Sequence, residues 1–292
     1  MKIQPECIPC LMKRCLYEIE LVNKDITLSK EVLIKAMETL VKEFDSNKCS
    51  ATIATRVHKV VYDGLGVKDL YKEVKRRSNE VALSLIPKIE ERIKRSKDPL
   101  KSAIISAIIG NTLDFGIEGG SRDPNDLVRA FDSYFKEGLG YSDYDIFREI
   151  LSKAKKALFI ADNCGEIVFD RILCREIKRF YPDVELILVV RGEPILSDAT
   201  REDAKILKFE EVVDGILDTG TFAVGLDLDN IPKELQKNLQ EADIVICKGM
   251  ANYEVFSELN YKPIAYLLRT KCNAVARSMG LKSGINALKV YL

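Results

Sequence analysis

Short apolar runs alternate with amphipathic stretches through the second half of the chain, and this alternation limits the possible folds more than any other feature. The runs are rich in β-branched residues and lack polar alternation, as expected for strands buried on both faces. The predicted strands are Ala157–Ala161, Val184–Val190, Val212–Leu217, Asp243–Cys247 and Pro263–Leu268. The predicted helices between them are Glu166–Phe180, Thr200–Lys208, Pro232–Glu241 and Ala251–Glu258. This order predicts an α/β domain over residues 146–292, with a parallel sheet and helices on both of its faces.

The first 145 residues show a different pattern, with apolar residues three or four positions apart and charged residues between them. That spacing is typical of amphipathic helices. The predicted helices are Cys10–Val22, Ser29–Phe44, Ala51–Leu65, Asp69–Arg95 and Pro99–Gly110. We therefore expect a helical N-terminal region over residues 1–145 that precedes the α/β domain.

Charge and hydropathy exclude several classes of partner. The chain has 45 Lys and Arg against 45 Asp and Glu, so no excess positive charge favours nucleic acid or a membrane surface. No apolar stretch approaches the roughly 20 residues of a membrane-spanning helix, and the first ten residues lack the apolar segment of a signal peptide. We expect a cytoplasmic protein whose eight cysteines are thiols, ligands or core residues and not disulfides.

Polar side chains follow each predicted strand, and in an open α/β sheet ligands bind at the carboxyl ends of the strands. Asp162 and Asn163 end the first strand, directly before Gly165 and a predicted helix. Their oxygens suit a hard divalent cation such as Mg²⁺ or Mn²⁺, and the helix start offers N–H groups to an anion. The alternative for this pair is a simple helix N-cap.

Other polar residues at or near this edge have comparable alternatives. Asp198 lies in a very polar loop, as a metal ligand or as the N-cap of the next helix. Lys248 and Lys271 each follow an apolar strand, either as phosphate counter-charges or as solvated lysines. Asn111 and Asp114 lie one helical turn apart after an apolar run; they either reach the cleft between the two halves or belong to a helix stop.

The N-terminus carries Cys7 and Cys10 in a CxxC motif. A closed zinc site needs four ligands, and the sequence offers no second CxxC pair. The two cysteines are therefore a thiol pair, part of a metal site or structural residues, and we expect them to act separately from the polar strand ends. The single histidine, His58, is expected to be structural.

Standard motifs of several enzyme classes are missing. The sequence has no GxxxxGK[ST] motif of a P-loop and no GxGxxG after the first strand. It also has no GxSxG elbow, and one histidine makes a Ser–His–Asp triad improbable.

Four segments together resemble the motifs of the damage-control phosphatases, a family of metal-dependent phosphatases once considered as possible carboxyl methyltransferases. They are Gly110–Gly116 (GNTLDFG), Ala161–Asp170 (ADNCGEIVFD), Arg191–Thr200 (RGEPILSDAT) and Lys248–Glu254 (KGMANYE). The Cys7–Cys10 motif resembles the mark of the CxxC-bearing subfamily I, which is common in archaea. Arg269–Lys271 is similar to an Arg-Thr-x-Lys signature but lacks its spacer residue, so only Lys271 is carried over.

The resemblance implies a Rossmann-like three-layer α/β/α domain, and a divalent metal (Mn²⁺, Mg²⁺, Ni²⁺ or Co²⁺) bound by Asp162, Asn163 and Asp198. It implies hydrolysis of phosphomonoesters of small metabolites, such as sugar phosphates or damaged phospho-metabolites. The catalytic candidates are Asp162, Glu166 and Lys248, and the substrate-binding candidates are Asn111, Asp114, Asn252, Glu254 and Lys271. Two alternatives remain at this point: an S-adenosylmethionine-dependent carboxyl methyltransferase, and a non-enzymatic redox or metal sensor built on the CxxC motif.

Overall fold

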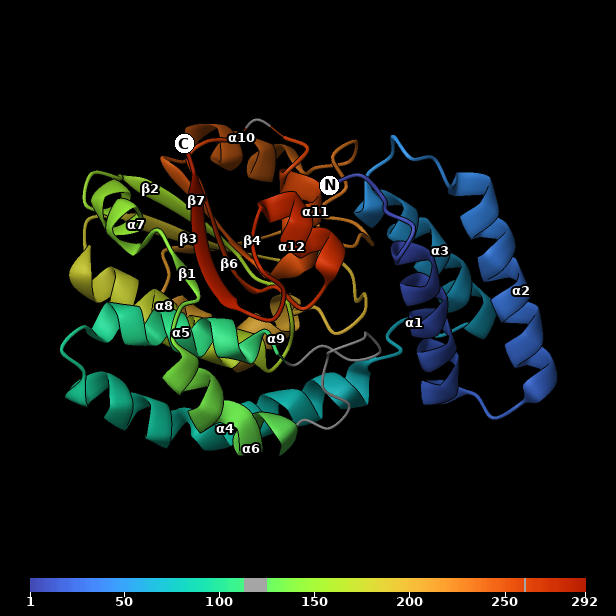
Figure 1. Ribbon diagram of the computed structural model, residues 1–292, viewed down its shortest axis with the longest axis horizontal. Helices are drawn as coiled ribbons and strands as arrows, with labels where there is room; N and C mark the ends of the chain where they lie inside the picture. The colour runs from blue at the N-terminus through green and yellow to red at the C-terminus, as the bar shows by residue number, and fades with distance from the viewer. Residues whose placement is uncertain (113–124, 260) are drawn as a thin grey trace.

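Seven strands form one sheet in the part of the chain that the computed structural model describes, residues 1–112, 125–259 and 261–292 (Figure 1). The strands are β1 (Tyr141–Ser142), β2 (Lys156–Ile160), β3 (Glu185–Val190), β4 (Gly215–Asp218), β5 (Ile244–Lys248), β6 (Ile264–Arg269) and β7 (Asn286–Tyr291). They lie in the order β1-β7-β6-β5-β2-β3-β4. The five predicted strands correspond to β2 through β6, which are parallel to one another as expected.

Successive strands are added on opposite sides of β2, so the strand order reverses there. From β2 the chain adds β3 and β4 on one side, and then returns to add β5 and β6 on the other. Phe159 on β2 therefore lies between Leu188 on β3 and Ile246 on β5, and all three are fully buried. Such a reversal opens a crevice at the carboxyl ends of the two diverging strands, which is where α/β proteins bind ligands.

The edge beyond β6 departs from the sequence prediction. β7 runs antiparallel to β6, with Leu267 opposite Leu288, and the two-residue strand β1 pairs in parallel with β7. Neither strand was predicted, and neither was α6, α7 or α12. The sheet is therefore mixed at this edge, while its centre is parallel.

Helices cover both faces of the sheet (Figure 1). α5 and α8 lie along one face with α4 and α6 outside them, and α10, α11 and α12 lie along the other. The helices are α1 (Cys7–Val22), α2 (Ile26–Glu43), α3 (Ser50–Leu65), α4 (Lys72–Arg95), α5 (Pro99–Gly110), α6 (Asn125–Glu137), α7 (Tyr144–Leu151), α8 (Glu166–Phe180), α9 (Arg201–Ile206), α10 (Lys233–Glu241), α11 (Gly249–Phe256) and α12 (Asn273–Met279), with a 3₁₀ turn η1 (Phe209–Glu211). This is the predicted three-layer α/β/α architecture, preceded by a helical N-terminal region.

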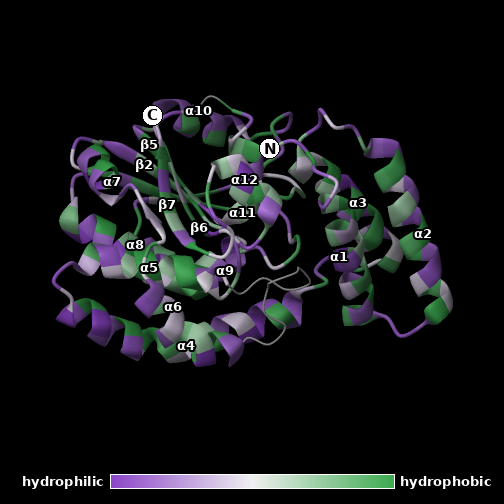
Figure 2. Ribbon diagram, in the orientation of Figure 1, coloured by the Kyte–Doolittle hydropathy of each residue, from purple (hydrophilic) through white to green (hydrophobic). Residues whose placement is uncertain are grey.

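The first three helices form a separate bundle at one end of the molecule (Figure 1). Asp25 caps α2 by accepting hydrogen bonds from the N–H groups of Thr27 and Leu28, and Gly66 ends α3 in the left-handed conformation. Hydrophobic and hydrophilic residues alternate along these helices (Figure 2), and α3 packs against α11. The bundle therefore touches the α/β body close to the carboxyl end of β5.

The remaining N-terminal elements belong spatially to the α/β body. α5 packs on α8, and β1 is part of the sheet. The division of the chain at residue 145 into two domains stays a prediction. None of the helices within the described ranges has the length and apolar character needed to cross a lipid bilayer.

Candidate active site

The carboxyl ends of β2 and β5 meet at the point where the strand order reverses. Asp162 follows β2, and α11 begins with Gly249 directly after β5. A Cβ on Gly249 would lie 1.8 Å from Oδ2 of Asp162, and the φ angle of this glycine is +73°. Only glycine therefore fits here, because it has no Cβ and tolerates positive φ. The absence of a side chain on Gly249, directly after Lys248 at the end of β5, allows the ends of β2 and β5 to come into close contact.

Backbone pairing joins the three predicted metal ligands. Asn163 forms an isolated antiparallel bridge with Asp198, and the N–H of Ala199 donates to the carbonyl of Asp162 over 2.8 Å. The Ser197 hydroxyl donates to Oδ1 of Asn163 over 2.6 Å. Asp162, Asn163 and Asp198 all line the same cavity, as the sequence predicted for neighbouring strand ends.

The N-cap alternatives for these residues do not hold. The N-cap of α8 is Gly165, with no side-chain cap hydrogen bond, and its N–H donates to Oδ1 of Asn79 over 2.6 Å. α9 is capped by Thr200 together with Asp203, and not by Asp198. The oxygens of Asp162, Asn163 and Asp198 are therefore not committed to capping the helices that follow them.

Arg191 joins the site from β3 and was not singled out from the sequence. Its Nε donates to Oδ2 of Asp198 over 2.5 Å, and its Nη2 donates to Oδ1 of Asn252 over 3.0 Å. Nη2 also lies 3.6 Å from Oδ1 of Asp162. The side chain is 1% exposed, so this guanidinium contacts Asp162 and Asp198 from the buried side of the site. An arginine directly after a buried apolar strand is the signal that would have found it.

Lys248 lies in a buried ion network and not on the cavity wall. Its ammonium contacts Glu166, lies 2.8 Å from Oδ1 of Asp170 and donates to the carbonyl of Ala107 over 3.0 Å. All three side chains are fully buried. Three neighbours use the three donors of an ammonium. The expected counter-charge to a phosphate is therefore corrected to a counter-charge for two carboxylates.

The same network perturbs ionisation. Burial raises the pKa of Asp170 to about 7, and the neighbouring Lys248 opposes that rise only in part. Burial alone would lower the pKa of Lys248, but Asp170 and Glu166 raise it above its usual value. The lysine stays charged, and the carboxylates share its single positive charge.

Asn111 connects the buried ion network to Asp162 through hydrogen bonds. Its Nδ2 lies 2.9 Å from Oε2 of Glu166 and 3.2 Å from Oδ2 of Asp162, and its side chain is fully buried. Asn163 makes the same connection, with Nδ2 2.7 Å from Oδ2 of Asp162. Asn111 is the C-cap of α5, so the helix-stop interpretation holds, and its side chain also contacts Asp162 at the end of β2. Asp114, the other candidate of that motif, lies outside the described residues.

The cavity has a volume of about 410 Å³ and lies between the N-terminal bundle and the carboxyl edge of the sheet. Lys271 and Glu254, both predicted substrate contacts, line it. The Lys271 ammonium donates to the carbonyl of Asn111 over 2.6 Å, and Glu254 accepts from the hydroxyl of Ser50 on α3 over 2.5 Å. Asn252, in contrast, is fully buried and ties the carbonyls of Ala161 and Lys248 together.

The CxxC motif also borders this cavity. Cys7 and Cys10 lie in the first turn of α1 and line the same cavity as the predicted metal ligands, as does Cys272. Burial raises the pKa of the Cys7 thiol to about 11, with smaller contributions from Glu254 and Cys272. The bundle therefore folds back over the edge of the sheet and brings the two cysteines to the cavity, while their separate action stays a prediction.

Comparisons with known proteins agree with this geometry. Residues 3–286 match the family model described as "Damage-control phosphatase ARMT1-like domain". The chain is 41% identical over 290 residues to a damage-control phosphatase of Archaeoglobus fulgidus, covering 99% of each chain. It is 32% identical over 284 residues to a damage-control phosphatase of Pyrococcus horikoshii, covering 97% of this chain and 96% of that one. The crystal structure of a DUF89 family protein from Pyrococcus horikoshii matches with a TM-score of 0.89 at 32% identity, covering 99% of both chains.

Proposed function

The chain belongs to the family of the damage-control phosphatase ARMT1-like domain, and we propose that it is a metal-dependent phosphatase that hydrolyses phosphomonoesters of small metabolites. The relatives are named phosphatases, which favours this interpretation over a methyltransferase or a CxxC sensor. A cytoplasmic location and membership of the CxxC-bearing subfamily I are part of the proposal.

One observation carries the proposal. Two carboxylates and an amide, from Asp162, Asn163 and Asp198, line one cavity together with the ammonium of Lys271. Oxygen donors of this kind fit a hard divalent cation, and a lysine beside such a cation fits a phosphoryl group. Asp162 follows β2 at the reversal of the sheet order, and Lys271 follows β6 at the same edge of the sheet; this edge is the usual ligand position in this architecture.

The donor set fits Mg²⁺ or Mn²⁺ best among the divalent ions considered, and Ni²⁺ or Co²⁺ remain within the proposal. Asp162 and Asp198 supply negative charge, and Arg191 balances part of it from the buried side. A bound ion of this class polarises phosphoryl oxygens and lowers the pKa of water. Asp162, Asn163 and Asp198 are the residues that would hold it.

The other residues divide into substrate contacts and supports. We assign Lys271 to the phosphate and Glu254 to the orientation of the attacking water, because both line the cavity. Glu166 and Lys248 are positioning residues that act through Asn111, whose amide joins Glu166 to Asp162.

Turnover of a panel of phosphomonoesters tests the proposal. The full chain is stripped of metal with a chelator and assayed with Mg²⁺, Mn²⁺, Co²⁺ or Ni²⁺ added back. We expect activity to be lost on stripping and restored by at least one ion. Asp162→Ala and Asp198→Ala should abolish turnover, and Lys271→Ala should lower it by on the order of 10²–10³, as for a well-placed electrostatic group.

A surface aspartate provides the matched control. The Asp63 side chain on α3 is 61% exposed and pairs with Lys59, one turn away on the same helix, over 2.6 Å. Exposed pairs of this kind contribute little, so Asp63→Ala should retain wild-type turnover. Full activity of Asp162→Ala with added metal, or undiminished activity of the stripped wild-type chain, would reject the proposal.

A further inference from the structure

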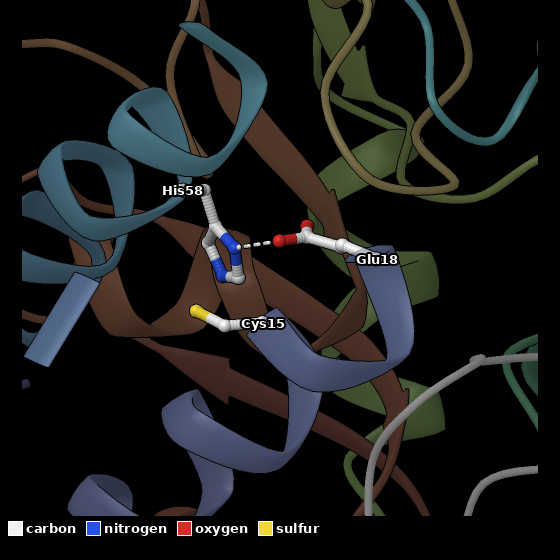
Figure 3. A group of neighbouring side chains, drawn as sticks. All are labelled: Cys15, Glu18 and His58. Atoms are coloured by element: carbon white, nitrogen blue, oxygen red, sulfur yellow. Dashed lines mark hydrogen bonds and ion pairs between the residues drawn. The ribbon is translucent and has the colours of Figure 1, made fainter. Parts of the chain in front are cut away.

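Cys15, Glu18 and His58 form a compact cluster inside the N-terminal bundle (Figure 3). Cys15 and Glu18 lie one turn apart on α1, and His58 faces them from α3. One sulfur, one carboxylate oxygen and one ring nitrogen of the three residues all lie within 4.8 Å of one another. The side chains are at most 1% exposed, so bulk water does not hydrate their polar atoms.

Glu18 is incompletely satisfied. Its Oε2 lies 2.9 Å from Nδ1 of His58, but its Oε1 has no hydrogen-bond partner among the described residues. A buried carboxylate oxygen without a partner is costly. A cation held between the carboxylate and its neighbours would remove that cost.

We propose that Cys15, Glu18 and His58 bind a zinc ion that joins α1 to α3. Thiolate, imidazole and carboxylate are the three ligand types that zinc takes in proteins. Their mixture of soft and borderline donors differs from the oxygen donors of Asp162 and Asp198, so the two sites select different ions.

The spacing of the cluster suits this ion after small side-chain movements. Zinc bonds of about 2.0–2.3 Å in a tetrahedron place ligand atoms roughly 3.3–3.8 Å apart. The nitrogen and oxygen of the His58–Glu18 pair are already 2.9 Å apart, and the widest span in the cluster is at most 4.8 Å. Side-chain rotations of the three residues supply the adjustment from these separations to the bonding geometry.

A proton leaves when the ion binds. Burial and the nearby Glu18 raise the pKa of the Cys15 thiol, so the metal-free cluster holds a neutral thiol. Zinc replaces the thiol proton, which is released to solvent. His58 also lines the 410 Å³ cavity, which gives the ion a path in and a water a place at the fourth coordination position.

Cobalt substitution of the full chain tests this site independently of the proposed phosphatase function. Co²⁺ bound to a thiolate gives a near-ultraviolet charge-transfer band, whereas Co²⁺ bound to oxygen ligands alone does not. We expect this band in the wild-type chain, together with one tightly held zinc per chain after purification. Zinc added at equimolar amounts should bleach the band.

Three cysteine variants locate the ligand. Cys15→Ser should lose the band and weaken zinc binding by on the order of 100-fold or more, since even outer-shell changes cost 10–100-fold. Cys174→Ser, at a buried cysteine of α8, is the matched control and should keep both. Cys7→Ser/Cys10→Ser should also keep the band, because those thiols border the cavity and are not part of the cluster.

Several outcomes would overturn the site. No band in the wild-type chain would leave Glu18 and His58 as a hydrogen-bonded pair only, and this result needs no variant. A band that persists in Cys15→Ser would assign the thiolate to another cysteine, and a band that disappears in Cys7→Ser/Cys10→Ser would assign it to the CxxC motif. If circular dichroism shows that Cys15→Ser is unfolded, His58→Gln takes its place, and retention of tight zinc by a folded His58→Gln rejects the proposal.

Discussion

Replacing Lys248 by methionine separates a structural role of this lysine from a role in phosphate binding. The ammonium is fully buried between Glu166 and Asp170. Methionine keeps an unbranched chain of similar length but leaves two buried carboxylates without their cation. Breaking a buried ion pair by removing one partner costs about 3–5 kcal/mol. For a chain of this size that corresponds to a fall in melting temperature of roughly 5–8 °C.

Thermal unfolding followed by circular dichroism, together with kcat and KM, is the assay. Lys153→Met is the control, because Lys153 forms an exposed pair with Glu149 over 2.6 Å and such pairs contribute little. Its melting temperature should stay close to that of the wild type. A Lys248→Met protein that melts within about 2 °C of the wild type and shows only a raised KM would refute our account of the network.

Three further predictions follow from individual residues. Gly249→Ala places a Cβ 1.8 Å from the Asp162 carboxylate after β2, so turnover should fall by on the order of 10²-fold. Gly66→Ala, at a glycine that also has a positive φ but has open space around it, should remain active. Burial raises the pKa of Asp170 to about 7, so its contribution to the free energy of unfolding falls as the pH rises from about 4 to 7. Urea unfolding across this range should show a smaller fall for Asp170→Asn than for the wild type. The same dependence of unfolding free energy on pH in both proteins would be evidence against the raised pKa. Cys7→Ser/Cys10→Ser should keep metal-dependent turnover, and a loss as deep as that of a metal-ligand variant in a folded protein would place the thiols in the active site.

The centre of the fold was predictable because β2 through β6 are short apolar runs with a helix signal between consecutive runs. β7 escaped prediction because it lies towards the edge of the sheet, where Lys289, Val290 and Tyr291 are partly exposed and its pattern is not continuously apolar. β1 has two residues, which is too short to show any period. Its place in the sheet depends on pairing with β7, about 145 residues further along the chain.

The proximity of the metal-ligand candidates was predictable for a similar reason, and their role as ligands stays a proposal. Carboxyl ends of parallel strands share one edge, so Asp162 and Asp198 were expected to lie close together. The direction of the Lys248 side chain could not be predicted from the sequence, because its partner Glu166 lies 82 residues away along the chain. The position of Cys7 beside the cavity depends on how the bundle packs over the sheet edge, and helical periodicity carries no information about that packing.

The location of Mn²⁺ in a crystal of the full chain, determined from its anomalous scattering, tests the central claim most directly. We predict one strong site at the carboxyl ends of β2 and β3, with oxygens of Asp162, Asn163 and Asp198 about 2.0–2.6 Å from the ion. A manganese ion bound elsewhere, with these three oxygens more than roughly 6 Å away and so well beyond any bonding distance, would contradict the account.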